Sequence, residues 1–420
     1  MRFRNCTFLL VLGAGAFAQQ YDLLLSGGRL IDPRNGIDAP RAVAVRNGRI
    51  AAVAERIDPA RAKRVVDVGG LLITPGLVDI HTHFFYTANM PGAWAGDQSI
   101  MPDSFSFRTG VTTMVDAGSA GWRNFEFFRA TVMNQAQTRV FAFINIAGYG
   151  MSSNMVEQDD FDPDAVARLA RKHRDVVVGV KAAHYEKPGW TQVDAALRAG
   201  ELAGIPMMVD FGYFLPERPY WRLVTERLRP GDITTHVYRG PVPWLDEQGR
   251  LYSYLSEARR RGVIFDVGHG GGSFVWRNAV PAVAQGFYPD TISTDLHAGS
   301  QNAGMIDLPT TMSKFLAMAM PLTEIVARVT DRPAKVIGRA ELGHLSPGAV
   351  ADIAVWRVLP GEFGFKDASG ATLAGRQRLQ CELTLKDGQV VWDWNGRVGT
   401  DYRQMPPDYG VREGEFVVRP

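Results

Sequence analysis

Two histidines one residue apart, His81 and His83, close the apolar stretch LLITPGLVDIHTH. The continuous Leu, Ile and Val of this stretch, punctuated by Pro75 and Gly76, predict one buried parallel strand. Because strand side chains alternate between faces, positions 81 and 83 point the same way. Two neutral imidazoles on one face can bind a single metal ion. The competing interpretation is a pair of hydrogen-bonded polar residues at a strand end.

Further side chains that can bind metal recur at the ends of later apolar segments. They are Lys181, Asp210, His236, His269, and Asp295 with His297. Each of them alone is typical of a hydrogen-bonded structural residue. In a parallel barrel, however, the carboxyl ends of all strands open on one face, where active sites lie. Such side chains would therefore lie together, which favours a metal site over ordinary packing.

Eight buried segments, separated by helical patterns, indicate the elements that would position these side chains. The expected strands are 76–83, 110–118, 139–148, 176–184, 205–212, 232–238, 263–270 and 291–297. Helical patterns cover 162–174 and 191–204, and the first opens with Asp162 before Pro163, as a capped helix does. We therefore expect an α/β fold, a (β/α)8 TIM barrel. A doubly wound open sheet is the alternative, although the chain shows no glycine-rich dinucleotide fingerprint.

Short strands and tight turns flank the expected barrel, which covers residues 75–340. Residues 19–74 alternate apolar side chains with glycine-containing turns, and residues 341–420 return to this pattern before a proline- and charge-rich tail from about Arg397. The first β layer cannot bury both of its faces alone. We therefore expect both ends of the chain to meet in one composite β-sandwich beside the barrel.

The composition is that of a globular protein, with 46% hydrophobic and 21% charged residues among 420. Charges of both signs are interspersed and the formal net charge is +2, so nothing electrostatic favours nucleic acid or an anionic membrane as a partner. A small-molecule substrate is the expected partner. The oligomeric state stays open, a homo-oligomer included.

Residues 1–18 differ from the rest of the chain. Arg2 and Arg4 precede a short apolar run that ends in Ala16-Phe17-Ala18, which predicts a secretory signal peptide and export to the periplasm or the medium. A buried strand or a short anchor is the alternative. Export would leave Cys381 as the single cysteine, so no intramolecular disulfide could form.

Several motifs together resemble the amidohydrolase superfamily of metal-dependent hydrolases. They are PGLVDIHTH at 75–83, GVK at 179–181, TTH at 234–236, STDLH at 293–297 and LSPGAVADIAV at 345–355. Within that superfamily, GVTTMVDAGSAG at 110–121 and FDVGHGGGSF at 265–274 are similar to the deacetylase or dihydroorotase-like branch. The resemblance covers the chain from Tyr21 to about Gly396 and implies the same barrel and composite sandwich.

The resemblance also implies a site for one or two divalent metal ions, most often zinc. His81, His83 and Asp295 would hold one ion. Lys181, carboxylated on its side-chain nitrogen, would bridge to a second ion that His236 helps to hold.

Asp210 departs from the pattern of that family, which usually has a histidine on strand five. An anionic oxygen in place of a neutral imidazole would make the second site prefer a harder cation, or bind more weakly. A mononuclear site therefore stays open. An unmodified Lys181 amine paired with Asp210 stays open as well.

The expected chemistry is hydrolysis, because a divalent metal lowers the pKa of a bound water from about 15.7 towards about 7. Asp295 is the candidate general base. His269 is a candidate to bind substrate or stabilise an oxyanion, with a structural role beside the 270–272 glycines as the alternative. His297 and His184 are further candidates for substrate binding.

These features predict a metal-dependent hydrolase that cleaves an amide or ester bond in a small acylated compound bearing a carboxylate. A cyclic amidase is the nearest alternative, and a catalytically silent binding protein is the rival from another class. Retention of Asp295 argues against the silent protein, which would need no base. Arg239, Arg277 and Arg123 are candidate partners for the carboxylate, and the sequence does not rank them.

Overall fold

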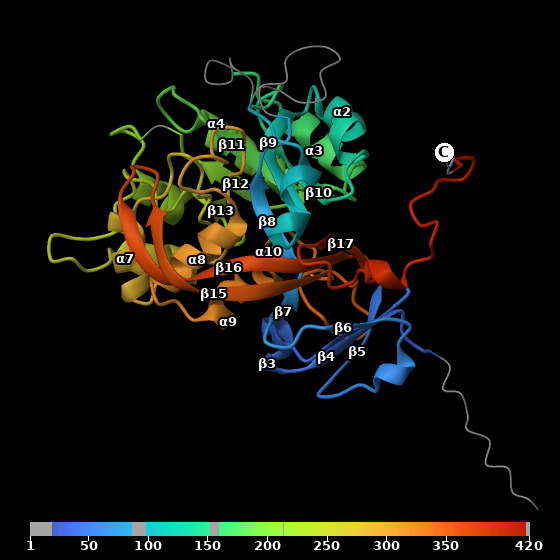
Figure 1. The fold of residues 1–420 in the computed structure, drawn as a ribbon. Helices are drawn as coiled ribbons and strands as arrows, with labels where there is room; N and C mark the ends of the chain where they lie inside the picture. The colour runs from blue at the N-terminus through green and yellow to red at the C-terminus, as the bar shows by residue number, and fades with distance from the viewer. Residues whose placement is uncertain (1–18, 86–97, 152–158, 213, 417–420) are drawn as a thin grey trace, which may run out of the picture.

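The computed structural model describes residues 19–85, 98–151, 159–212 and 214–416, whose strands form three sheets (Figure 1). The predicted signal peptide, residues 1–18, lies outside the described residues. Among the helices of the described residues, none combines the length and the apolar character that a membrane crossing requires.

Seven parallel strands form the central sheet, in the spatial order β14-β13-β12-β11-β10-β9-β8. Their bounds are β8 Leu77–Thr82, β9 Val111–Gly121, β10 Arg139–Asn145, β11 Val177–Ala183, β12 Met207–Asp210, β13 Ile233–Thr234 and β14 Ile264–Phe265. The segment after β14 reaches both edges of this sheet. Thr291 makes a parallel bridge to Asp266, and Leu296 makes one to Thr82.

The last three expected strands are much shorter than their apolar patterns predict. β13 and β14 have two residues each, and the segment 291–297 forms only the two isolated bridges. The physical reason is local backbone geometry. His236, Gly268 and Asp295 have positive φ angles of 59°, 46° and 50°, which turn the chain out of the extended conformation just where its polar residues begin.

The apolar run before His81 is two strands rather than the single strand that its composition predicts. β7 (Leu72–Pro75) pairs antiparallel with β15 (Ile353–Lys366), whereas β8 belongs to the parallel sheet. The chain passes between the sheets at Gly76, where a Cβ atom would lie 2.5 Å from Thr112 Oγ1. Only a residue without a side chain fits this crossing.

Helices follow the strands along the chain. α3 (Pro163–Lys172) begins as predicted, with the Asp162 carboxylate accepting a hydrogen bond from the Ala165 amide, and α4 (Thr191–Ala203) ends at Gly204 with φ of 67°. The other helices are α1 Pro102–Phe105, α2 Phe125–Phe128, α5 Tyr220–Arg222, α6 Ser253–Arg260, α7 Trp276–Ala284, α8 Leu308–Ala317, α9 Leu322–Ala327 and α10 Asp331–Val336. Short 3-10 or π turns cover Pro33–Asn35, Pro59–Arg61, Phe107–Thr109, Arg129–Met133, Leu223–Arg227 and Tyr402–Gln404.

β8 shows how a strand of this sheet positions the site. Val78 and Ile80 share an apolar cluster with Ala334 and Ile337, from α10 and the residue after it. Because side chains alternate, Asp79, His81 and His83 face the opposite way. Burial of the apolar face therefore fixes the direction in which the histidines point.

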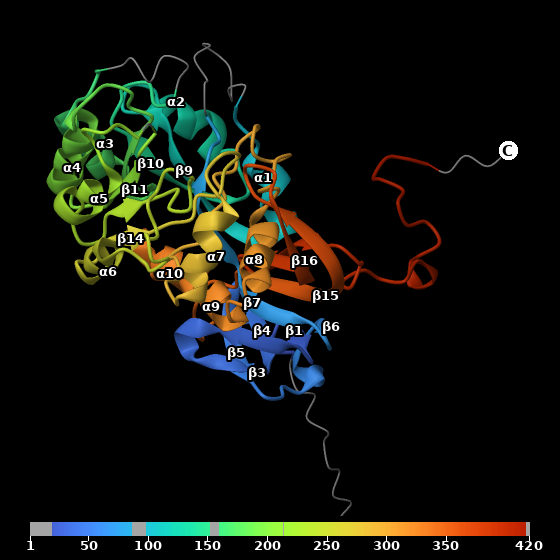
Figure 2. The same cartoon turned by 90° about the vertical axis from the view of Figure 1, so that its left-hand side faces the viewer.

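Strands from both ends of the chain form the remaining two sheets. One has the order β5-β4-β1-β6 and the other β17-β16-β15-β7-β2-β3. Their bounds are β1 Leu23–Ser26, β2 Arg29–Asp32, β3 Ile37–Pro40, β4 Ala42–Arg46, β5 Arg49–Ala54, β6 Val65–Asp67, β16 Thr372–Lys386 and β17 Gln389–Asp393. One apolar cluster joins the two sheets, for example Leu25 and Val43 with Val355 and Leu383. Figure 2 shows the long β15 and β16 extending from this region to lie beside α8.

Gly110 and Gly70 offer a matched test of the packing between β9 and β15. Both have φ of 73°, but a Cβ on Gly110 would lie 2.5 Å from the buried Trp356 ring, whereas nothing lies within 4 Å of a Cβ on Gly70. We expect Gly70→Ala to cost about 1–2 kcal/mol of unfolding free energy for the left-handed backbone alone. Gly110→Ala should cost about 1–3 kcal/mol more because of overpacking. Urea unfolding measures both, and equal shifts of the two midpoints would contradict this account of the packing.

Candidate active site

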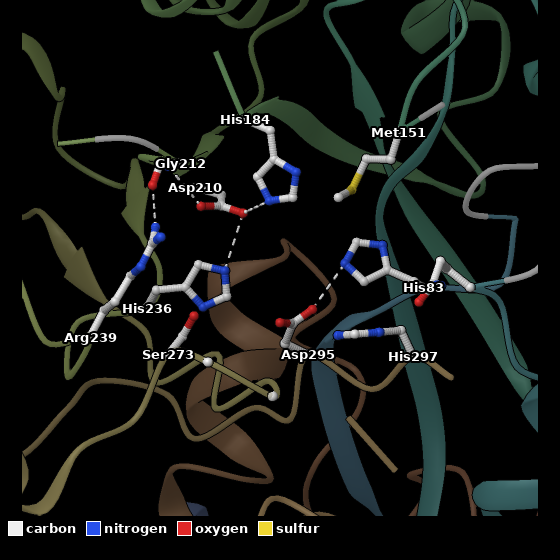
Figure 3. Close-up of a pocket in the computed structure, with 13 residues that line it drawn as sticks. His83, Met151, His184, Asp210, Gly212, His236, Arg239, Ser273, Asp295 and His297 are labelled. Carbon is white, nitrogen blue, oxygen red and sulfur yellow. Dashed lines mark hydrogen bonds and ion pairs between the residues drawn. The ribbon is translucent and has the colours of Figure 1, made fainter. Parts of the chain in front are cut away.

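A pocket of about 370 Å³ opens where the carboxyl ends of the parallel strands meet (Figure 3). It is lined by His83, Gln98, Met151, His184, Asp210, Gly212, His236, Arg239, Gly271, Gly272, Ser273, Asp295 and His297. Six of these side chains are site residues predicted from the sequence. Three other predicted residues, His81, Lys181 and His269, are buried outside this lining.

His81, His83 and Asp295 present one possible ligand atom each, and these three atoms lie within 4.8 Å of one another. The Oδ1 atom of Asp295 is 3.1 Å from Nε2 of His83 and 3.5 Å from Nε2 of His81. Two imidazole nitrogens and one carboxylate oxygen form a typical donor set for a divalent transition metal. The residues present therefore fit such an ion.

The outer nitrogens of both histidines are held by hydroxyl groups. Thr235 Oγ1 donates a hydrogen bond of 2.7 Å to Asp266 and lies 2.9 Å from His81 Nδ1. Because the hydroxyl proton goes to Asp266, His81 must donate from Nδ1, which leaves its Nε2 lone pair directed inward. Ser119 Oγ lies 2.9 Å from His83 Nδ1 in the same way. Such outer partners orient metal ligands in proteins.

Burial and the nearby Lys181 lower the pKa of His81 to about 3. The imidazole is therefore neutral near neutral pH, which is the form that binds metal. Burial raises the pKa of the Asp295 carboxyl, but His81, His83 and other histidines around it outweigh burial and hold its pKa well below the ordinary value. Asp295 is thus ionised at neutral pH and can bind a cation.

The position of the Asp295 carboxylate depends on Gly270. A Cβ atom on Gly270 would lie 2.3 Å from Asp295 Oδ2, and Gly270 itself has φ of 53°. The Gly270–Gly272 turn therefore gives the carboxylate room to lie between its own strand end and the pocket. This requirement for space explains why a glycine follows His269.

Lys181 on β11 is fully buried, and its Nζ atom lies 3.1 Å from His81 Nε2 and 3.5 Å from Met208 Sδ. Gly118, with φ of 84°, makes room for it, because a Cβ there would lie 2.5 Å from Lys181 Cβ. Burial lowers the pKa of the Lys181 amine, although Asp210 and other carboxylates oppose that shift. An unmodified Lys181 paired with Asp210 was one possibility from the sequence. In the structure the Lys181 amine instead contacts the His81 imidazole.

Asp210 at the end of β12 lies between two histidines. Its Oδ2 atom is 2.8 Å from His184 Nε2 and 3.2 Å from His236 Nε2 (Figure 3). Burial alone would raise the pKa of Asp210, but His236 and His184 lower it far below its ordinary value. The ring centroids of His236 and His81 are 5.0 Å apart, so this trio adjoins the first group of ligands.

His269 and His297 have different surroundings. His269 is fully buried, stacked on Phe274 at 4.5 Å between ring centroids, and its Nε2 lies 2.5 Å from Nζ of Lys314. Burial and Lys314 lower the pKa of His269 to about 3. His297 lines the pocket and makes an edge contact with His83 at 6.2 Å between ring centroids. Of these two candidates for substrate binding, the pocket exposes His297.

Sequence reasoning overlooked the residues that contact the predicted site histidines, namely Thr235, Ser119, Asp266 and Lys314. Thr235 had a signal, because it precedes His236 in TTH. Asp266 lies on the seventh apolar segment beside His269, and its carboxylate accepts hydrogen bonds from Thr291 and Ser293. Nothing local in the sequence links Ser119 to His83 or Lys314 to His269, since these contacts join separate elements.

Comparisons with known proteins identify the family to which this chain belongs. The model of the Amidohydrolase family matches residues 315–392. A deacetylase of Agrobacterium fabrum is 34% identical over 335 residues, which are 77% of this chain and 80% of the relative. The solved structure of an adenine deaminase is 28% identical with a TM-score of 0.80, covering 89% of this chain and 100% of its own. The solved structure of a dihydroorotase is 30% identical with a TM-score of 0.77, and the match covers 88% of this chain and 99% of the dihydroorotase chain.

The chain belongs to the amidohydrolase family, and it is a metal-dependent hydrolase. The family and the enzyme class predicted from the sequence are therefore confirmed. These three relatives are a deacetylase, an adenine deaminase and a dihydroorotase, so their activities differ from one another.

The outer partner of His81 can be tested through Asp266. Asp266→Asn replaces an oxygen that accepts from Thr235 with an amide, and we expect metal affinity to fall by about 10–100-fold while the fold is kept. Titration of the metal-free protein against a competing chelator measures the affinity. Thr291→Val is the control, because it removes one donor to Asp266 but leaves the contact with Thr235. Unchanged affinity in Asp266→Asn would contradict the role of this pair.

Proposed function

We propose that this chain is a deacetylase-like hydrolase that cleaves an amide or ester bond in a small acylated compound bearing a carboxylate. The observation that carries the proposal is the convergence of His81, His83 and Asp295 at the end of the parallel sheet. The deacetylase relative supports the reaction class. We also infer that the segment 291–296 completes a (β/α)8 barrel by bridging β14 and β8.

His81 Nε2, His83 Nε2 and Asp295 Oδ1 would hold the metal ion, for which zinc suits the donor set. When bound, a divalent ion supplies Lewis acidity and lowers the pKa of water. Carboxylation of Lys181 would favour binding, because the amine that now faces His81 Nε2 would be replaced by oxygen acceptors. Burial, which lowers the pKa of Lys181, favours the neutral amine that such a modification requires.

Asp295 would carry the proton during hydrolysis. Its Oδ1 atom faces the two histidines, while Oδ2 lies beside Gly270. In the forward reaction Asp295 accepts a proton from the attacking water as the bond from water oxygen to the acyl carbon forms. It returns that proton to the leaving nitrogen or oxygen as the scissile bond breaks, giving a carboxylic acid and an amine or alcohol.

Arg239 is the arginine that best fits a substrate carboxylate. It lines the pocket, donates a hydrogen bond to the Gly212 carbonyl and lies over the Phe214 ring at 5.4 Å. Arg123 instead pairs with Asp160 outside this lining, and Arg277 donates to the Gly240 carbonyl at the surface. The pocket volume of about 370 Å³ limits the substrate to a small molecule.

A cyclic amidase that opens a dihydroorotate- or hydantoin-like ring is the second candidate. The dihydroorotase structure, at 30% identity and a TM-score of 0.77, favours it. The same metal ligands and the same base would serve ring opening. Assays with N-acyl and O-acyl carboxylates beside cyclic amides separate the two, since only one class should turn over efficiently.

Asp295→Asn tests the proposed base. The substitution keeps the shape of the side chain but removes its proton acceptor, so we expect kcat to fall by at least about a hundredfold while fold and metal content are largely kept. Turnover of an acylated substrate, with metal content measured on the same samples, provides the test. Full activity in a metal-replete preparation of this variant would refute the assignment, and wild-type protein without activity on any acyl or cyclic substrate would refute the function.

Arg239→Met tests the carboxylate partner. A hydrogen bond to a charged group contributes about 1.5–3 kcal/mol, so we expect KM for a carboxylate-bearing substrate to rise about tenfold to hundredfold. The KM of an uncharged analogue should change little. Arg277→Met is the matched control at the surface, and an equal effect of both variants would rule out a specific contact with Arg239.

A further inference from the structure

We propose that Lys314 is a positioning residue for Asp295, on which it acts through His269 and the backbone of Gly270. The inference rests on the proposed function, in which Asp295 is the base, and adds to it a support that lies outside the pocket. A buried amine, an imidazole and a glycine backbone follow one another behind the Asp295 carboxylate, and this juxtaposition carries the inference.

Lys314 lies on α8 and is fully buried. Its Nζ atom meets three acceptors, which are His269 Nε2 at 2.5 Å, the Lys366 carbonyl at 2.6 Å and the Gly304 carbonyl at 2.7 Å. Three acceptors match the three N–H groups of an ammonium. Because a buried cation needs such partners, the three segments that supply them are held around one point.

The ring of His269 passes this contact on to Gly270. His269 Nδ1 lies 2.9 Å from the Gly270 carbonyl, which can only accept, so Nδ1 carries the proton and Nε2 accepts from Lys314. Stacking on Phe274, at 4.5 Å between centroids and 7° between planes, fixes the orientation of the ring. The Gly270 amide donates to the Thr294 carbonyl at 2.8 Å, so the backbone of Gly270 is held from both sides.

The backbone of Gly270 in turn limits where the Asp295 carboxylate can lie. A Cβ on Gly270 would be only 2.3 Å from Asp295 Oδ2, so the two groups are in close contact. The other oxygen, Oδ1, faces His81 at 3.5 Å and His83 at 3.1 Å. A shift of Gly270 would therefore turn the carboxylate away from the two histidines. A misplacement of about 1 Å can slow catalysis about a hundredfold.

The other two contacts of Lys314 connect the same point to the β15–β16 hairpin, which lies beside α8 (Figure 2). Lys366 ends β15, and a Cβ on Gly304 would lie 2.6 Å from its carbonyl oxygen, so the loop after Asp295 packs closely on the hairpin. That loop also holds Asp295, because Ser300 Oγ donates a hydrogen bond of 2.9 Å to the Asp295 carbonyl. The C-terminal hairpin thus supports the base through two routes.

Lys314→Met tests the inference, because it keeps the aliphatic part of the side chain and removes the amine. We expect kcat to fall about tenfold or more on an acylated substrate. KM should change little, since Lys314 and His269 lie outside the described lining of the pocket. The affinity of the metal-free protein for zinc, measured against a competing chelator, should fall about tenfold, because Asp295 is a proposed ligand.

Ser313→Ala is the matched control. Ser313 is the buried neighbour of Lys314 on α8, and its Oγ atom accepts a hydrogen bond of 3.0 Å from the Leu379 amide of β16. The variant therefore removes a contact between the same helix and the same hairpin, but not the contact with His269. We expect wild-type kcat and zinc affinity, with thermal melting of both variants to measure the stability that each has lost.

A double-mutant cycle tests whether Lys314 acts through His269. His269→Phe keeps a ring that can stack on Phe274 but removes both nitrogens. If the two residues act as one unit, kcat of the double variant should be no lower than that of His269→Phe alone, whereas independent effects would multiply. Gly304→Ala is the second route if Lys314→Met does not fold. It displaces the loop from the hairpin while keeping the amine, and should also lower kcat.

Wild-type kcat and zinc affinity in Lys314→Met would overturn the inference. Equal losses in Ser313→Ala would overturn it as well, because they would show a general effect of packing, and so would multiplied losses in the double variant. Failure of the proposed function is distinguishable, because wild-type protein would then bind zinc without hydrolysing any substrate. The zinc affinities of the variants would still test the support of Asp295.

Discussion

The buried carboxylates at the carboxyl end of the parallel sheet are the constraint on which the rest of this structure depends. A carboxylate removed from water must be paired or hydrogen-bonded, because burial of an isolated charge is very costly. Asp295 faces His81 and His83, Asp210 faces His184 and His236, and Asp266 accepts from three hydroxyl groups on two neighbouring segments. Each pairing uses a different strand end, so the strands must converge for any of them to be buried.

Backbone conformation at the strand ends is the second part of this arrangement. His236 and Asp295 leave the extended conformation with positive φ, and glycines at 118, 268 and 270 admit side chains where a Cβ would collide. The regular strands are short for this reason. β13 and β14 therefore form few hydrogen bonds between strands, and the residues that follow them place polar side chains in buried positions. Strain at these positions is supported by the rigid sheet beneath them.

Some predictions about the site followed from local patterns, and others could not. His81, His83 and Asp295 each follow an apolar segment, the resemblance to the amidohydrolase superfamily implies that they hold one ion, and the structure brings them together. His269 ends such a segment as well, but its ring stacks on Phe274 and faces Lys314 instead of the pocket. The run before His81 divides at Gly76 into strands of two sheets, because β15 from the far end of the chain pairs with its first half.

The sequence by itself determined the types of ligand, the alternation of buried segments with helices, the turns of both flanks and the family. These properties depend on neighbours along the chain, where periodicity and turn residues act. Only the tertiary structure decided which atoms meet. Lys181 reaches His81 across 100 residues and Thr294 binds Asp79 across 215, and the hydroxyl that supports each histidine comes from another strand. Such contacts depend on how the sheet brings distant strand ends together, which no local pattern encodes.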